Sequence, residues 1–191
     1  MKHMLVCFFI TGLVACNKEV GDTPSFPKMR YSELNDVRIG FGQQKMIDID
    51  GDNSTDLLFT TVLVGDPVLK RDRKQYYVNA SFDTFLLTDA IEQTPIFKIG
   101  EVIPIGNPPG LNWFNASSVV LVEKIIELDD PAHWEGNWKN ATHRYLAVQL
   151  RKDNKRYNGW VEISVEIDLG QMVLHRAAIS EEPGRSVRAG H

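Results

Sequence analysis

Cysteine is nearly absent from this sequence: the 191 residues include only two, Cys7 and Cys16. Because no cysteine follows residue 16, the rest of the chain can form no internal disulfide, and a scaffold stapled by disulfides is excluded. Catalysis by a cysteine thiol is excluded beyond that point for the same reason. The folded part must therefore be stabilised by its hydrophobic core or by another kind of cross-link.

Long hydrophobic runs and long basic runs are missing as well. The most apolar stretch, residues 4–15, covers about 12 residues, whereas a membrane-spanning helix needs about 20. The densest basic segment is the short KRDRK at 70–74, in a chain whose formal net charge is −4. This charge balance disfavours nucleic acid as a partner.

Short motifs that identify a reaction are also absent. The sequence contains no HExxH pair for zinc, no GxSxG serine elbow and no phosphate loop with its lysine. We therefore assign no catalytic residues from the sequence and favour a protein that is not an enzyme. The alternative is a secreted-type hydrolase whose site is assembled only in three dimensions.

The N-terminus has the pattern of an export signal, in which a basic start precedes a short apolar run. The run ends in LVAC at 13–16, which resembles the lipobox of bacterial lipoprotein precursors. That resemblance implies a signal peptide over residues 1–15, a lipidated Cys16 as the anchor to the membrane, and a location in a bacterial cell envelope, with the outer membrane favoured. Residues 16–30 are polar and predict a tether, and residues 31–191 are expected to form a single domain.

The domain is predicted to be all-β. Apolar and β-branched residues come in short runs separated by turn residues, and residues 157–168 alternate strictly, which is typical of a half-buried antiparallel strand. The runs before and after this strand predict a three-strand C-terminal meander. We expect an antiparallel β-sandwich with one or two short helices, near residues 90 and 130.

The clearest chemical feature is the acidic stretch IDIDGDNSTDLL at 47–58. Its carboxylates would repel one another in a compact loop, and the nearby Lys45 alone cannot neutralise them. A divalent cation can, because hard oxygen ligands at positions one, three, five, seven and nine suit Ca²⁺. The predicted calcium ligands are the carboxylates of Asp48, Asp50, Asp52 and Asp56 and the main-chain carbonyl of Ser54.

This DxDGDxxxD pattern resembles the calcium loops of FG-GAP and related repeats and, to a lesser degree, an EF-hand loop. It departs from the EF-hand because Asn53 replaces the sixth-position glycine and Phe59 stands where the bidentate glutamate would be. A propeller of FG-GAP repeats would need several copies, and the sequence contains one. The alternative to a calcium site is a solvated acidic turn without metal.

A second, longer resemblance concerns the order of segments along the chain. IDIDGDNSTDLLF, YNGWVEISV and EEPGRSVRAGH follow one another as in a group of exported bacterial β-proteins of unknown function. The resemblance implies an exported β-fold and carries no activity.

Aromatic residues supply the remaining functional hint. Trp134 and Trp138 flank a polar segment, and their rings could stack on a sugar while Asn137 donates hydrogen bonds; the alternative is that the rings are structural. We favour structural roles for Trp113 and Trp160. The sequence thus leaves three hypotheses: a calcium-stabilised binding or adhesion module for a glycan or another envelope protein, a hydrolase, and a purely structural envelope component.

Overall fold

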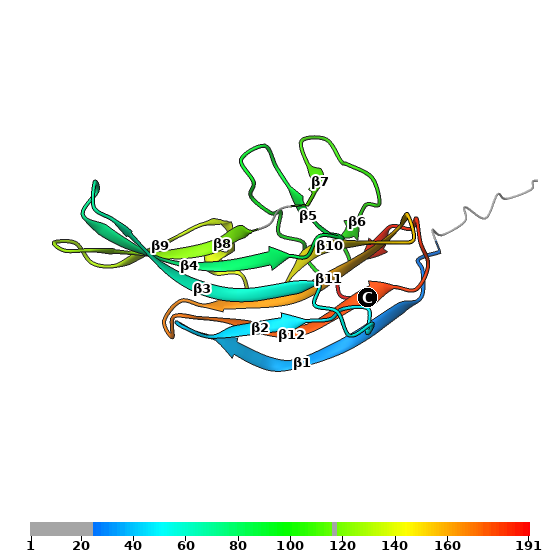
Figure 1. Ribbon diagram of the computed structural model, residues 1–191, viewed down its shortest axis with the longest axis horizontal. Coiled ribbons are helices and arrows are strands. Elements are labelled where there is room, and N and C mark those ends of the chain that lie inside the picture. Colours follow the sequence, from blue (N-terminus) through cyan, green and yellow to red (C-terminus); the bar gives the residue numbers. More distant parts are fainter. Residues whose placement is uncertain (1–24, 116–117) are drawn as a thin grey trace, which may run out of the picture.

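The computed structural model describes residues 25–115 and 118–191, and in this part of the chain the secondary structure is almost entirely antiparallel β (Figure 1). The predicted signal peptide, Cys16 and most of the tether lie outside the described residues. The first strand begins at Met29, two residues before the predicted domain start. None of the described segments forms a helix with the length and apolar character needed to cross a membrane.

The larger sheet has six strands. Its spatial order is β1 (Met29–Ile39), β12 (Gln171–Ser180), β11 (Lys155–Glu166), β10 (Arg144–Lys152), β5 (Thr84–Thr88) and β7 (Asn112–Phe114). β10, β11 and β12 are consecutive antiparallel neighbours, which confirms the predicted C-terminal meander.

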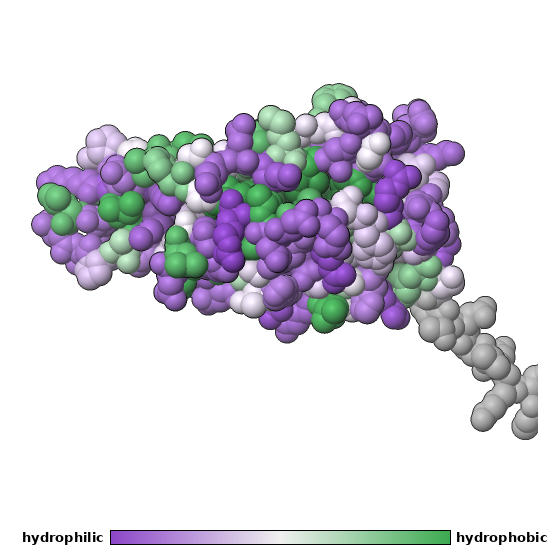
Figure 2. All heavy atoms as spheres, turned by 90° about the horizontal axis from the view of Figure 1, so that it is seen from below, coloured by the Kyte–Doolittle hydropathy of each residue, from purple (hydrophilic) through white to green (hydrophobic). Residues whose placement is uncertain are grey.

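The second sheet has five strands and faces the first, so the predicted all-β sandwich is confirmed (Figure 1). Its spatial order is β2 (Gln44–Ile47), β3 (Leu57–Asp66), β4 (Arg71–Ala80), β8 (Val119–Glu127) and β9 (His133–Glu135). A two-stranded ribbon of β6 (Val102–Ile103) and β13 (Val187–Arg188) completes the fold. The ends of β3, β4, β8 and β9 extend beyond the sandwich as an arm, and Figure 2 shows apolar atoms there dispersed among hydrophilic ones.

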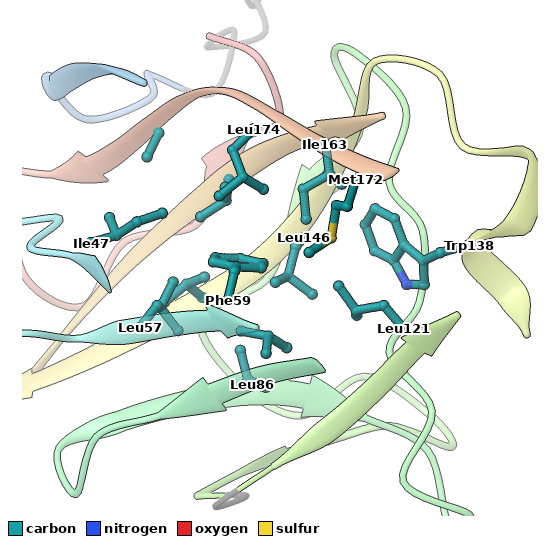
Figure 3. Close-up of a cluster of buried hydrophobic side chains, with 14 of the residues drawn as sticks. Ile47, Leu57, Phe59, Leu86, Leu121, Trp138, Leu146, Ile163, Met172 and Leu174 are labelled. Carbon is teal, nitrogen blue, oxygen red and sulfur yellow. The ribbon is translucent and has the colours of Figure 1, made fainter. Parts of the chain in front are cut away.

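The main core fills the space between the two sheets. Figure 3 shows Leu57 and Phe59 of β3 facing Leu146 of β10 and Ile163 of β11, all of them fully buried. Trp138 lies at one end of this core. Burial of such large side chains contributes about 1.5–3 kcal/mol each, so the core can stabilise a domain that has no disulfide.

A second, smaller core covers the outer face of the six-stranded sheet. Trp160 of β11 and Trp113 of β7 are buried in it, together with Val187 of the ribbon, so the structural roles expected for both tryptophans are confirmed. Gly159 permits close strand packing here, because a Cβ on it would lie 2.3 Å from the main-chain oxygen of Ala178. As a result β11 is buried on both faces over most of its length, and the half-buried strand predicted from its alternation is wrong.

The short helices expected near residues 90 and 130 are replaced by other structures. At the first place Asp89 Oδ1 accepts hydrogen bonds from the main-chain N–H groups of Ile91 and Gln93, which stabilises a turn instead of a helix. At the second place His133–Glu135 pair with β8 as strand β9. The described residues contain one short 3₁₀ helix, η1 (Asn137–Asn140).

Candidate metal centre

The acidic stretch forms the connection between β2 and β3. Ile47 and Ile49 on one side and Leu57 on the other are fully buried, which fixes both ends of the loop in the main core. The main-chain N–H of Asp56 donates to the carbonyl of Ile47 at 2.9 Å. The loop is therefore a closed turn whose two ends are fixed in the main core.

Asp48 organises the inside of this turn. Its Oδ1 accepts the N–H of Gly51 at 2.7 Å and that of Asp52 at 3.2 Å, and its Oδ2 accepts the N–H of Asn53 at 2.7 Å. Gly51 and Asn53 both have positive φ, as expected for a glycine and an asparagine at tight bends. The sequence pattern thus folds the chain around one carboxylate.

Three carboxylates converge in the loop. Oxygen atoms of Asp48, Asp50 and Asp56 all lie within 4.8 Å of one another. Two full charges about 5 Å apart repel by about 3 kcal/mol at an effective dielectric near 20. These three residues could hold a metal ion, whose charge would offset that repulsion.

Asp56 is the most perturbed acid of the group. The pKa of its carboxyl is raised to about 6, because burial and the charges of Asp50, Asp48 and Asp52 outweigh the lowering effect of the Ile49 N–H, which donates to Oδ2. Without a cation, Asp56 therefore keeps a proton at mildly acidic pH. A bound cation would favour its ionised form.

Two basic residues from distant strands reach the loop, and the sequence interpretation missed both. Lys152, at the end of β10, places its Nζ 2.9 Å from Asp50 Oδ2 and 3.2 Å from Asp52 Oδ2. Arg30 of β1 donates a hydrogen bond to the main-chain carbonyl of Asp50. Lys152 stands about 100 residues away in the sequence, and no local pattern indicates that its hairpin lies over the acidic loop.

The other two predicted ligands lie at the edge of the cluster. Asp52 is outside the group of three converging carboxylates, and its Oδ1 accepts the N–H of Ser54 at 2.9 Å. That hydrogen bond, followed by the one from Lys152, lowers the pKa of Asp52. Ser54 is exposed. Ligation through Asp52 Oδ2 would require the ammonium of Lys152 to move away from that oxygen.

Two clefts flank Lys152. One, of about 370 Å³, is lined by loop residues including Asp50 and Asp56 and by the β10–β11 turn. The other, of about 390 Å³, lies between Arg30, Lys152 and Tyr157. The acidic loop therefore borders a cleft on each side of the Lys152 ammonium.

The aromatic residues proposed for sugar stacking do not form an exposed pair. Trp138 is 1 % exposed, and its indole N–H donates to Thr94 Oγ1 at 2.8 Å. Its ring faces are covered by the main core, so the interpretation of Trp138 as a stacking residue is corrected to a structural role. Trp134 is partly buried with its ring 5.5 Å from that of Tyr76, and Asn137 lies on the surface at the start of η1.

Comparison of the chain with models of protein families, with curated proteins and with solved structures found no match.

Proposed function

We propose that this protein is a lipid-anchored component of a bacterial cell envelope, in which one structural Ca²⁺ in loop 48–56 stabilises a β-sandwich that binds an extracellular glycan or another envelope protein. The convergence of Asp48, Asp50 and Asp56 within 4.8 Å carries the calcium part. Carboxylates are hard oxygen ligands, and a metal of flexible coordination suits a loop that also offers main-chain carbonyls.

The full ligand set of the proposal is Asp48, Asp50, Asp52 and Asp56 with the carbonyl of Ser54. Calcium would displace Lys152 from its two carboxylates and a proton from Asp56. Both displacements cost free energy, and the loop has no bidentate glutamate. We therefore expect a modest dissociation constant of about 10⁻⁵ to 10⁻³ M, as in extracellular modules.

Thermal unfolding with and without calcium tests this proposal. At about 100 times the dissociation constant, mass action contributes about 2.7 kcal/mol. The Asp50→Asn variant should lose this calcium response, whereas Asp153→Asn, which removes an equal charge in the adjacent hairpin turn, should keep it. Equal melting temperatures of the unsubstituted protein in 10 mM calcium and in chelator would identify the loop as a metal-free turn.

The anchor part of the proposal is supported by the LVAC segment that ends at Cys16. Mass spectrometry of protein extracted from membranes should find a peptide that begins at Cys16 and carries two or three acyl chains. An unmodified mature N-terminus at another residue would contradict it.

The binding part is supported by the two clefts beside the acidic loop, because concave surface next to a rigid turn suits ligand recognition. A glycan array and a pull-down with the mature chain, each in calcium and in chelator, test this part. A ligand that binds the unsubstituted chain in calcium, and that no longer binds the Lys152→Ala or Tyr157→Ala variant, would support the clefts as the binding site. Binding that neither substitution changes would contradict their role, and no binding at all would favour the purely structural component.

A further inference from the structure

A second group of polar side chains lies on the outer face of the six-stranded sheet, toward the end of β11 that is remote from the β10–β11 turn. It contains Asp36 of β1, Ser164 of β11 and His175 of β12. These three strands are neighbours in the order β1, β12, β11, so the sheet brings together residues that are far apart in the sequence.

The three side chains form a continuous hydrogen-bonded series. Ser164 Oγ lies 2.8 Å from His175 Nε2, and His175 Nδ1 lies 2.6 Å from Asp36 Oδ1. A serine, a histidine and an aspartate joined through these atoms form the arrangement in which a histidine acts as general base toward a serine hydroxyl.

The hydrogen bonds also determine the direction of the serine proton. The main-chain N–H of His143 donates to Ser164 Oγ at 2.9 Å, so the hydroxyl hydrogen is free to point at His175 Nε2. The other ring nitrogen, Nδ1, then carries the proton and donates it to Asp36. This is the tautomer that can accept a proton from Ser164.

Irregular backbone builds this arrangement. The pairing of β1 with β12 shifts register between Glu33 and Val37, and Asp36 inside that shift has a positive φ of 52°. A non-glycine residue in this region stores conformational strain, which the surrounding structure has to offset. A regular β1 would place its side chains differently, so the bulge is what aims Asp36 at His175.

Neighbouring groups hold the histidine in place. The ring of His143 stacks on that of His175, with centroids 4.2 Å apart, and His143 Nδ1 lies 2.7 Å from Glu162 Oε1. Arg176 Nε donates to Glu162 Oε2 at 2.6 Å. Although burial raises the pKa of Glu162, the hydrogen bonds from Arg176 and His143 outweigh it and lower that pKa. An ionised Glu162 can therefore keep the His143 ring against His175.

We propose that Ser164 is an activated nucleophile that accepts the acyl group of a small ester, with His175 as its general base and Asp36 as the positioning residue. Ser164 Oγ forms a bond to the ester carbonyl carbon while its proton passes to His175 Nε2. The carbon–oxygen bond to the alkoxide then breaks, and the alkoxide leaves with that proton as an alcohol. Water, activated by the same histidine, finally releases the acid and restores Ser164.

The surroundings of Ser164 limit the substrate and the rate. Ser164 retains 7 % exposure, so a small acyl group is the form that can approach Oγ. The hydrogen bond to Oγ from the main chain comes from His143 alone among the described contacts. Because this donor engages the attacking oxygen itself, we expect slow turnover, and a stable covalent adduct is the sharper readout.

The test is covalent labelling of the purified full chain with a fluorophosphonate, followed by intact mass measurement and peptide mapping. Ser164 Oγ would bond to phosphorus, fluoride would leave, and the proton would pass to His175. We expect a single adduct on Ser164, and slow release of p-nitrophenol from p-nitrophenyl acetate should be blocked by that adduct. The His175→Gln variant should label about 100-fold more slowly or worse, the range expected for a lost general base.

Two further variants separate chemistry from folding. The side chain of Asp36 is 69 % exposed, so Asp36→Asn should melt like the unsubstituted protein and yet label at least about 10-fold more slowly, because the tautomer of His175 is no longer fixed. Ser32→Ala on β1 serves as the control and should label normally. An adduct on another residue, or labelling of Ser164 that is unchanged in both His175→Gln and Asp36→Asn, would overturn the proposal.

Discussion

Substitution of Asp56 by asparagine should change stability in opposite directions with and without calcium. The folded-state pKa of Asp56 is about 6, against an ordinary value of 3.8. At 1.36 kcal/mol per unit this difference corresponds to about 3 kcal/mol. Because the half-buried carboxylate is partly screened by water, we expect Asp56→Asn to stabilise the metal-free protein at pH 7 by about 1 to 2 kcal/mol.

The amide keeps an oxygen that can accept the N–H of Ile49, so the variant removes mainly the charge. A gain of this size raises the melting temperature of a domain of this length by about 2 to 8 °C in chelator. In calcium at about 100 times the dissociation constant the order should reverse, because mass action then stabilises the unsubstituted protein by about 2.7 kcal/mol and the variant lacks one of the metal ligands. Differential scanning calorimetry measures both conditions. A variant that is no more stable than the unsubstituted protein in chelator would refute the raised pKa of Asp56 and its two causes, burial and repulsion among the loop carboxylates.

Three other perturbations test separate parts of the structure. Lys152→Met removes the ammonium that bridges two loop carboxylates, so calcium no longer has to displace it, and calorimetric titration should give a several-fold lower dissociation constant. The folded pKa of Asp56 lies above its unfolded value, so the folded chain binds more protons than the unfolded chain between pH 4 and 6. The stability of the metal-free protein should therefore fall as pH rises through that window, while stabilisation by calcium grows. Melting temperatures at pH 5, 6 and 7 with and without calcium measure both trends. Gly159→Ala places a Cβ 2.3 Å from the main-chain oxygen of Ala178. Chemical denaturation should show that this variant lowers the free energy of unfolding by about 3 kcal/mol or more. In the control variant Gly106→Ala the new Cβ meets nothing within 4 Å, so its free energy of unfolding should be nearly unchanged.

The parts of the fold that depend on local pattern could be predicted from the sequence. Alternation of apolar residues along 157–168, with turn residues on both sides, correctly indicated the meander of β10, β11 and β12. The acidic loop is equally local, because all its aspartates lie within nine residues. The convergence of Asp48, Asp50 and Asp56 follows from one closed turn between two buried strand ends.

The parts that depend on long-range register could not be predicted. Lys152 reaches the loop because β10 ends beside it, and no spacing in the sequence encodes that placement. The polar face of β11 is buried because the β6–β13 ribbon and β7, which come from other parts of the sequence, cover it. Alternation of apolar and polar residues within β11 cannot indicate that cover. Ser164, His175 and Asp36 meet through a register shift in β1, and bulges leave no reliable mark in a single sequence.

Isothermal titration of calcium into the purified mature chain at pH 7 tests the central claim most directly. One site per chain, with a dissociation constant of about 10⁻⁵ to 10⁻³ M and with its heat abolished by Asp50→Asn but not by Asp153→Asn, is the predicted result. An absence of binding heat at millimolar calcium, or an equal response in the two variants, would contradict a calcium site in the 48–56 loop.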